Sequence, residues 1–151
     1  EAGVDALRAG ALILTDTEMA AAAVRPMASR TLGASVRTVL EWAPSIAPVG
    51  STRTAAGMDA AWHQLEADRP APIVLIGSAP TALEVLLKLV AEGAALPTLV
   101  IGMPVGFVGV AESKRHLAES GLTQIRLDGT RGGAGLAGAA LNSLLRAAQK
   151  A

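Results

Sequence analysis

Short apolar runs alternate with helical periods along this chain. Runs of apolar or alternating residues predict β-strands at residues 11–14, 36–40, 73–76, 96–101 and 124–127. Between these runs, apolar residues recur at helical spacing, which predicts helices at residues 1–9, 18–24, 50–66, 81–92, 110–119 and 136–149. Strands that alternate with helices indicate an α/β fold with a doubly wound parallel sheet.

Capping residues and prolines mark the expected ends of these elements. Thr15, Asp16 and Thr17 offer N-caps for the helix at 18–24, which we expect to end before Pro26 and to be followed by a loop. Asp16 then lies at the carboxyl end of a strand, beside a helix N-terminus. Arg126 indicates that the last strand lies at an edge of the sheet.

The segment GMPVGFVGVAESK, at residues 102–114, joins the strand at 96–101 to the next helix. Its glycines permit backbone angles and close approaches that a Cβ atom would block. In an open α/β sheet, ligands bind where a strand ends and a helix begins with unpaired N–H groups. On residue types alone the segment is either a ligand-binding loop or a glycine-rich connection without a ligand.

Composition excludes several classes of function. With 151 residues, we expect one domain spanning residues 1–151. A net charge of +0 and 2% aromatic residues argue against a nucleic-acid partner. The chain has no cysteine and two histidines, so neither a disulfide nor a metal site is expected. No apolar segment approaches the ~20 residues that a membrane helix needs, and no secretory signal is visible, so we expect a cytoplasmic protein without a membrane partner.

Three segments make the chain similar to one known family. GMPVGFVGVAESK, GSAPTAL at residues 77–83 and RGG at residues 131–133 resemble the precorrin-8X methylmutases, the precorrin isomerases of cobalamin biosynthesis. The resemblance implies a flavodoxin-like fold with strand order 2-1-3-4-5 and a homodimer. It also implies an isomerase that converts precorrin-8X or cobalt-precorrin-8 to hydrogenobyrinate or cobyrinate by intramolecular methyl migration, with no cofactor and no metal.

The expected strand order brings the loops at residues 15–19, 77–81 and 102–109 to one crevice. The tetrapyrrole substrate of the family carries many acetate and propionate groups. Val105, Phe107 and Val108 would suit the face of its ring, while Arg53 and Lys114 would suit its carboxylates. The residues predicted to bind substrate are Thr15, Asp16, Thr52, Arg53, Ser78, Thr81, Met103, Val105, Gly106, Phe107, Lys114 and Arg131.

Other roles remain open for several of these side chains. Arg53 could be a solvated surface arginine, and Lys114 could form a salt bridge within its own helix. Asp16 and Glu18 could instead cap or complement the dipole of the following helix. Ser113 is expected to be structural.

The family's general acid is a histidine, and the resemblance implies that it precedes the region equivalent to Glu1, so that the chain lacks an N-terminal segment of the family. We therefore expect no catalytic residue among these 151 residues and no methylmutase activity from them alone. His63 and His116 are expected on helix surfaces. The chain departs from the family at Ser78 (usually asparagine), at Ala134 (usually serine) and at residues 24–26. The alternatives are a non-catalytic corrinoid-binding homologue and, more weakly, a flavodoxin-like regulatory domain.

Overall fold

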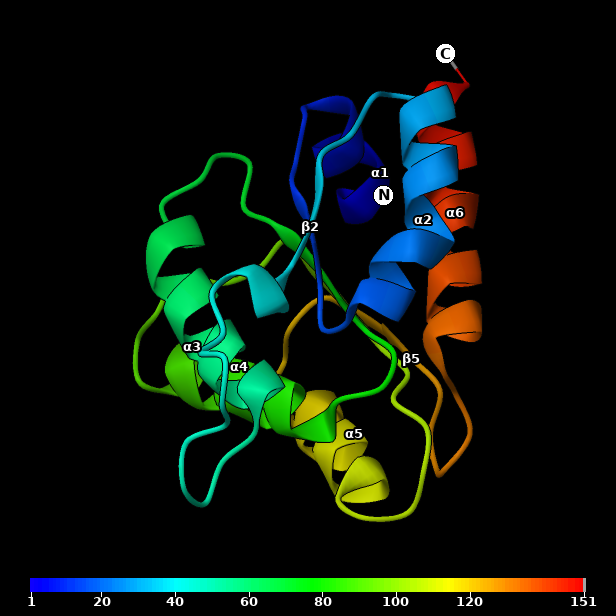
Figure 1. The fold of residues 1–151 in the computed structure, drawn as a ribbon. Helices are drawn as coiled ribbons and strands as arrows, with labels where there is room; N and C mark the ends of the chain where they lie inside the picture. The colour runs from blue at the N-terminus through cyan, green and yellow to red at the C-terminus, as the bar shows by residue number, and fades with distance from the viewer. Residues whose placement is uncertain (151) are drawn as a thin grey trace.

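The computed structural model of the protein describes residues 1–150 (Figure 1). Its centre is a five-stranded, wholly parallel sheet in the order β2-β1-β3-β4-β5, which confirms the predicted fold and topology. The strands are β1 (Ile13–Thr15), β2 (Val36–Thr38), β3 (Ile73–Ile76), β4 (Leu99–Gly102) and β5 (Gln124–Arg126). The α-helices are α1 (Ala2–Arg8), α2 (Glu18–Arg30), α3 (Arg53–Leu65), α4 (Pro80–Ala91), α5 (Val110–Glu119) and α6 (Ala134–Gln149).

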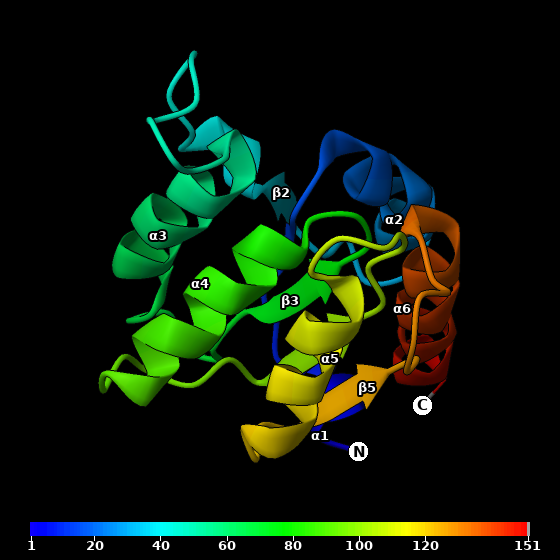
Figure 2. The same cartoon turned by 90° about the horizontal axis from the view of Figure 1, so that it is seen from below.

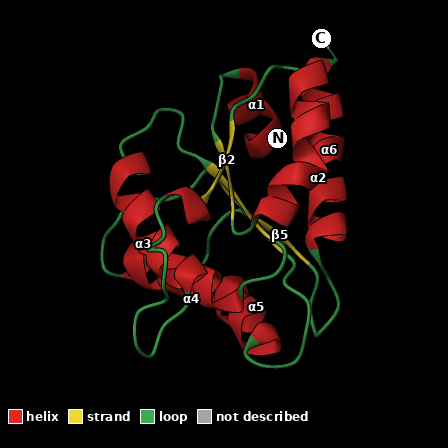
Figure 3. Cartoon of the chain, viewed as in Figure 1, coloured by secondary structure: helices red, strands yellow, loops and turns green. Residues whose placement is uncertain are grey.

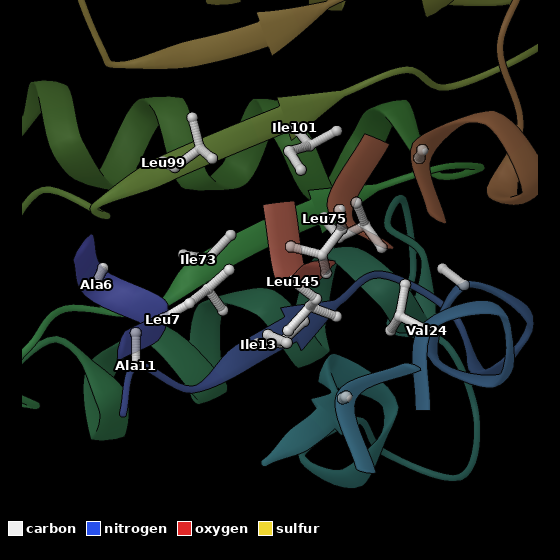
Figure 4. Packing of buried hydrophobic residues seen from close by; sticks show 14 of the residues in the cluster. Ala6, Leu7, Ala11, Ile13, Val24, Ile73, Leu75, Leu99, Ile101 and Leu145 are labelled. Carbon is white, nitrogen blue, oxygen red and sulfur yellow. The ribbon is translucent and has the colours of Figure 1, made fainter. Parts of the chain in front are cut away.

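Helices cover both faces of the sheet, as Figures 2 and 3 show. Successive side chains of a strand point to opposite faces, so Ile73 packs under α1, α2 and α6 while Val74 packs under α3, α4 and α5. Figure 4 shows the first of these two cores, in which Ile13, Ile73, Leu75 and Leu145 meet. Strands β3 and β4 are buried throughout, which is why their sequences are continuously apolar.

Helix α2 does not end before Pro26, contrary to the sequence prediction, but continues to Arg30. Proline removes one backbone hydrogen bond, to the carbonyl of Ala22 four residues earlier. Both Ala22 and Pro26 are exposed, so water can satisfy that carbonyl. The inner face of the helix carries Val24 and Ala28 into the core, and this packing maintains the helix beyond the proline.

All strands but β3 are shorter than their apolar runs suggested, β2 and β4 by two residues each and β1 and β5 by one. The two larger differences have local causes. Strand β2 ends at Thr38, because the Thr38 side chain and Glu41 form a reciprocal capping box that starts a 3-10 helix, η1 (Val39–Glu41). Strand β4 begins at Leu99 and not at Leu96, which is exposed and precedes Pro97. In both cases local capping or proline chemistry overrides the hydrophobic pattern.

Helices α2 to α6 each begin just after the carboxyl end of a strand or the loop that follows it. Their N-termini therefore gather at the carboxyl end of the sheet. The longest connection of the described chain, residues 42–52, is also at this end and stands out from the rest of the fold in Figure 2. Within residues 1–150, no helix is long and apolar enough to cross a membrane.

Candidate functional site

Asp16 fastens the end of β1 to the turn between β3 and α4. Its carboxylate accepts the backbone N–H groups of Gly77 at 3.2 Å, Ser78 at 2.8 Å and Ala79 at 2.7 Å. The side chain is fully buried, and Thr17, not Asp16, caps α2 by accepting the N–H of Ala20. Burial raises the pKa of Asp16, and the three backbone hydrogen bonds act in the opposite direction. The carboxylate thus occupies the anion-binding position of this turn and holds it in shape.

Three threonine hydroxyls meet where α3 and α4 begin. Thr52 Oγ1 lies 2.8 Å from Thr81 Oγ1 and 3.1 Å from Thr54 Oγ1. Thr52 also caps α3 by accepting the N–H of Ala55 at 3.0 Å. These hydrogen bonds join the N-termini of α3 and α4 side by side, and either hydroxyl of each pair can be the donor.

A hollow of about 450 Å³ opens beside this threonine cluster. Its walls come from the starts of α3, α4 and α5 and from the loops before α3 and α5. Its lining residues are Gly50, Ser51, Thr52, Ala55, Pro80, Thr81, Glu84, Val85, Val108, Gly109 and Glu112. Two carboxylates, Glu84 and Glu112, face it across the α4–α5 pair. The Glu84 carboxylate lies 2.6 Å from His116 Nδ1, in a hydrogen bond that becomes an ion pair when the imidazole is protonated. The two carboxylates make this side of the hollow polar.

The β4–α5 loop exposes large apolar side chains, of which Val108 lines the hollow. Val105 is 49% exposed, Phe107 86% and Val108 92%. Gly109 adopts a left-handed conformation at the N-cap of α5, which a side chain would disfavour. Ile46 and Val49, in the projecting connection before α3, are also largely exposed. The connections before α3 and before α5, which both line the hollow, therefore both carry exposed apolar side chains.

The β5–α6 loop lies against the β4–α5 loop. The N–H of Gly106 donates to the carbonyl of Thr130 at 3.1 Å, and the N–H of Gly133 donates to that of Met103 at 2.8 Å. Lys114, buried in α5, donates to the carbonyls of Gly129 at 2.8 Å and Arg131 at 2.6 Å. Burial lowers the pKa of the Lys114 ammonium, while the charge of Asp128 opposes this shift. Arg131 itself is exposed.

Arg53 begins α3 and is exposed, with its Nε donating to the carbonyl of Pro44 at 2.8 Å. This bond fixes the guanidinium over the connection at residues 42–52. The terminal nitrogens make no hydrogen bond or ion pair with other residues of the described chain, 1–150, so they present a planar, two-pronged donor face to the solvent.

The structure separates the predicted binding residues by their exposure. Thr52 and Thr81 line the hollow. Arg53, Val105, Phe107 and Arg131 are exposed and Ser78, Met103 and Gly106 are half-buried, but none of these seven lines the hollow. Thr15, Asp16 and Lys114 are buried and hold loops together by hydrogen bonds, so the loop at residues 15–19 contributes nothing to the walls of the hollow. A direct ligand contact stays a prediction for every one of these residues, and for the buried group it would require the present hydrogen bonds to rearrange.

Sequence reasoning missed Glu84 and Glu112 as lining residues. Glu84 lies one helical turn after Thr81, and Glu112 lies in the first turn of α5, so helical spacing from the two N-termini could have indicated both. Ser113, expected to be structural, is buried and donates to the carbonyl of Val110 at 2.8 Å. Glu18 pairs with Arg25 on the surface of α2 and lies outside the hollow.

Neither histidine lines the hollow. His63 lies in the last turn of α3, where Nδ1 is 2.7 Å from the carbonyl of Asp59. His116 lies in the last turn of α5 and reaches the hollow indirectly, through Glu84. Within residues 1–150, no group of three or more His, Cys, Asp or Glu side chains could hold a metal ion.

Comparison with known proteins assigns a family to this fold and crevice. The profile of the precorrin-8X methylmutases matches residues 1–147. A cobalt-precorrin-8 methylmutase of Synechocystis sp. is 41% identical over 143 residues, which are 95% of this chain and 64% of that protein. A precorrin-8X methylmutase of Pseudomonas aeruginosa is 41% identical over 147 residues, covering 95% of this chain and 69% of that protein.

Solved structures agree with these sequence matches. The precorrin-8X methylmutase structure from Thermus thermophilus superposes with a TM-score of 0.83 at 41% identity, over 97% of this chain and 71% of that chain. A protein described as related to precorrin-8X methylmutase superposes with a TM-score of 0.76 at 28% identity. The chain spans about two thirds of the length of the relatives it matches. On this fold, this crevice and these matches, the chain belongs to the precorrin-8X methylmutase family.

Proposed function

We propose that the crevice binds a corrinoid macrocycle and serves the isomerisation of precorrin-8X, or of cobalt-precorrin-8, by migration of a methyl group within the ring. The observation that carries the proposal is the β4–α5 loop, which exposes Val105, Phe107 and Val108 beside a hollow bounded by the N-termini of three helices. Exposed apolar side chains of this size mark a binding surface. Relatives with similar sequences are named for both substrates, so the sequence does not select between metal-free and cobalt-containing rings.

The charges around the crevice give the macrocycle an orientation. Its carboxylates are best accommodated near Arg53, whose outer nitrogens can grip a carboxylate in two-pronged fashion, and near the exposed Arg131. They are disfavoured in the hollow, where Glu84 and Glu112 carry the same sign of charge. The apolar ring face would rest on the β4–α5 loop, and the hydroxyls of Thr52 and Thr81 would meet polar groups at its margin.

In this proposal the residues of the crevice bind, orient and shield the ring. A methyl shift within one molecule needs no second substrate, so holding the ring in a reactive geometry lowers the barrier. Protonation of the ring by a positioned acid would ease the shift further, typically by ~10²–10⁴ in rate. We do not assign that proton to His63 or His116, because both lie in the last turns of their helices.

Arg53→Ala is expected to weaken hydrogenobyrinate binding by about 1.5–3 kcal/mol, the range for a charge-assisted hydrogen bond. Arg53→Lys should restore part of this loss, because lysine supplies the charge but not the planar pair of donors. Spectrophotometric titration gives the affinities, and thermal unfolding checks that loss of the bond to Pro44 leaves the fold intact. Equal affinities of all three proteins would make Arg53 a surface arginine that only fastens residues 42–52.

The function itself is tested by following the colour change as precorrin-8X is converted. We expect at most slow conversion by the 151-residue chain, and no further loss in His63→Ala or His116→Ala. Substantial turnover that either change abolishes would identify the missing acid and overturn our placement of both histidines. Saturable binding without any turnover would fit both an enzyme whose acid lies outside these residues and a non-catalytic corrinoid-binding homologue.

We further propose a symmetric homodimer that works in the cytoplasm. Helix α6 is rich in alanine and other small residues, which could pack closely against a partner, but these residues pack largely against α2, where a Cβ added at Gly138 would lie 2.8 Å from that of Ala23. A partner would therefore meet other surfaces, and exposed Ile46, Val49 and Phe107 are the apolar candidates. Sedimentation at micromolar concentration should give twice the 15.2 kDa of the chain, and a monomer would count against the dimer.

A further inference from the structure

Lys114 is buried to a degree that is unusual for lysine. It lies in the second turn of α5, and only 1% of the residue is exposed. Lysine is almost never fully buried unless its ammonium is paired, because removing the charge from water costs free energy. Here Nζ points to two carbonyl oxygens of the β5–α6 loop, those of Gly129 and Arg131. The free-energy cost of burying this cation is thus offset by hydrogen bonds that hold the β5–α6 loop.

The loop has few other attachments to the fold. Residues 127–131 are exposed, so burial of apolar side chains does little to fix them. Gly129, Gly132 and Gly133 all have positive φ angles, so the backbone is turned repeatedly and carries no regular ladder of hydrogen bonds. Two backbone bonds connect it to the β4–α5 loop, and the two bonds from Lys114 connect it to α5.

The Lys114 bonds act directly on the segment that carries Arg131. One ends on the carbonyl of Arg131 itself, and the other ends two residues earlier. The hydrogen bond from Gly106 to Thr130 connects the same segment to the β4–α5 loop, which contains Val105 and Phe107. The backbone from which the exposed Arg131 side chain projects is therefore held from inside α5.

We propose that Lys114 is a positioning residue, which ties the β5–α6 loop to α5 and so places Arg131 beside the apolar β4–α5 loop for ligand binding. The tie itself follows from the geometry alone, while its effect on a ligand rests on the proposed function. A direct grip on a ligand carboxylate is the competing role. For that role, Nζ would have to break its two hydrogen bonds, of 2.8 and 2.6 Å, and move from its buried position to the solvent-exposed surface.

The tie is tested by limited trypsin digestion of the full chain. Arg126 and Arg131 are both cleavage sites within or beside the loop. Lys114→Met keeps the length of the buried stem but removes the donors, and Lys88→Met, on the exposed face of α4, is the matched control. We expect Lys114→Met to be cut after Arg131 at least ten times faster than the parent, with a first fragment of residues 1–131. The control should match the parent. Lys114→Gln, whose amide NH2 group can still donate, should lie between them and serves if the methionine variant does not fold.

The effect on the ligand is measured by titration with hydrogenobyrinate in a double-mutant cycle with Arg131→Ala. Positioning predicts that Lys114→Met lowers affinity at least tenfold in the parent but hardly at all once Arg131 is alanine. Additive losses would show that Lys114 contacts the ligand itself, and unchanged affinity would reduce it to a structural residue; both outcomes overturn the proposal. An unchanged rate of cleavage overturns it as well. If the parent does not bind hydrogenobyrinate, the proposed function fails, and the digestion still decides whether the tie exists.

Discussion

Replacing Asp16 by alanine is expected to destabilise the protein by about 3–5 kcal/mol at neutral pH. Its carboxylate is the partner of three consecutive backbone N–H groups, those of Gly77, Ser78 and Ala79. Each buried donor left without an acceptor costs about 1–3 kcal/mol, and the two that are only partly buried recover some of this from water. For a chain of this size, we expect the melting temperature to fall on the order of 10 °C. Thermal and urea unfolding measure the loss.

Asp16→Asn is the matched control, because its carbonyl oxygen can still accept from this turn while its amide group cannot. It should therefore lose less stability than Asp16→Ala. Similar stability of the alanine variant and the parent would show that the turn does not depend on Asp16.

The pH dependence of the same comparison follows from the raised pKa of Asp16. Between its ordinary value of 3.8 and its value in the folded protein, the folded state binds the proton more tightly than the unfolded state does. The stability of the parent relative to Asp16→Asn should therefore be greatest below pH 3.8 and should fall as pH rises through this window. A difference that increases with pH would mean that the three hydrogen bonds outweigh burial and lower the pKa.

Gly132→Ala is expected to reduce ligand affinity on the order of 10–100-fold, since displacements of ~1 Å can have effects of this size at a reacting site. A Cβ atom at this position would lie 2.1 Å from the carbonyl oxygen of Met103 and 2.9 Å from that of Pro104. Both obstacles are backbone atoms, so the β5–α6 loop must move away from the β4–α5 loop. The movement would break the bond from Gly133 to Met103 and displace Arg131 from the apolar surface.

The matched control for this substitution is Gly121→Ala, in the turn between α5 and β5. Gly121 also has a positive φ, but a Cβ atom there would meet nothing within 4 Å. This variant should lose ~1–2 kcal/mol of stability from the left-handed backbone and keep its affinity for hydrogenobyrinate. Equal affinity of Gly132→Ala and the parent would show that the contact between the two loops is not part of the binding site.

The apolar runs sufficed to predict five strands of a parallel sheet, because burial on both faces leaves β3 and β4 continuously apolar. The order of the strands came from the family resemblance. The two larger errors in strand length and the error in the end of α2 have local causes. Thr38 and Glu41 cap a helical turn inside an apolar run, and Pro26 lies on the exposed side of a helix whose inner face is packed. In each case the end of the element is determined by capping or by solvent exposure, which the spacing of apolar residues does not report.

The site was predictable as a set of loops but not as a set of contacts. The motif residues do gather at the carboxyl edge, as parallel topology requires. The charged groups of Asp16 and Lys114, however, form hydrogen bonds with the backbone. The partners of Asp16 lie 61–63 residues away in the sequence, and those of Lys114 lie 15–17 residues away. A charged side chain at a strand end or in an early helical turn gives no sign in the sequence of whether it faces a ligand or a neighbouring loop.

The central claim is that this crevice holds a corrinoid ring. Spectrophotometric titration of the 151-residue chain with hydrogenobyrinate tests it most directly, with the Gly132→Ala variant run in parallel. We predict a saturable change in the spectrum of the ligand, with weaker binding by the variant. The absence of any saturable change with the parent chain would contradict the claim.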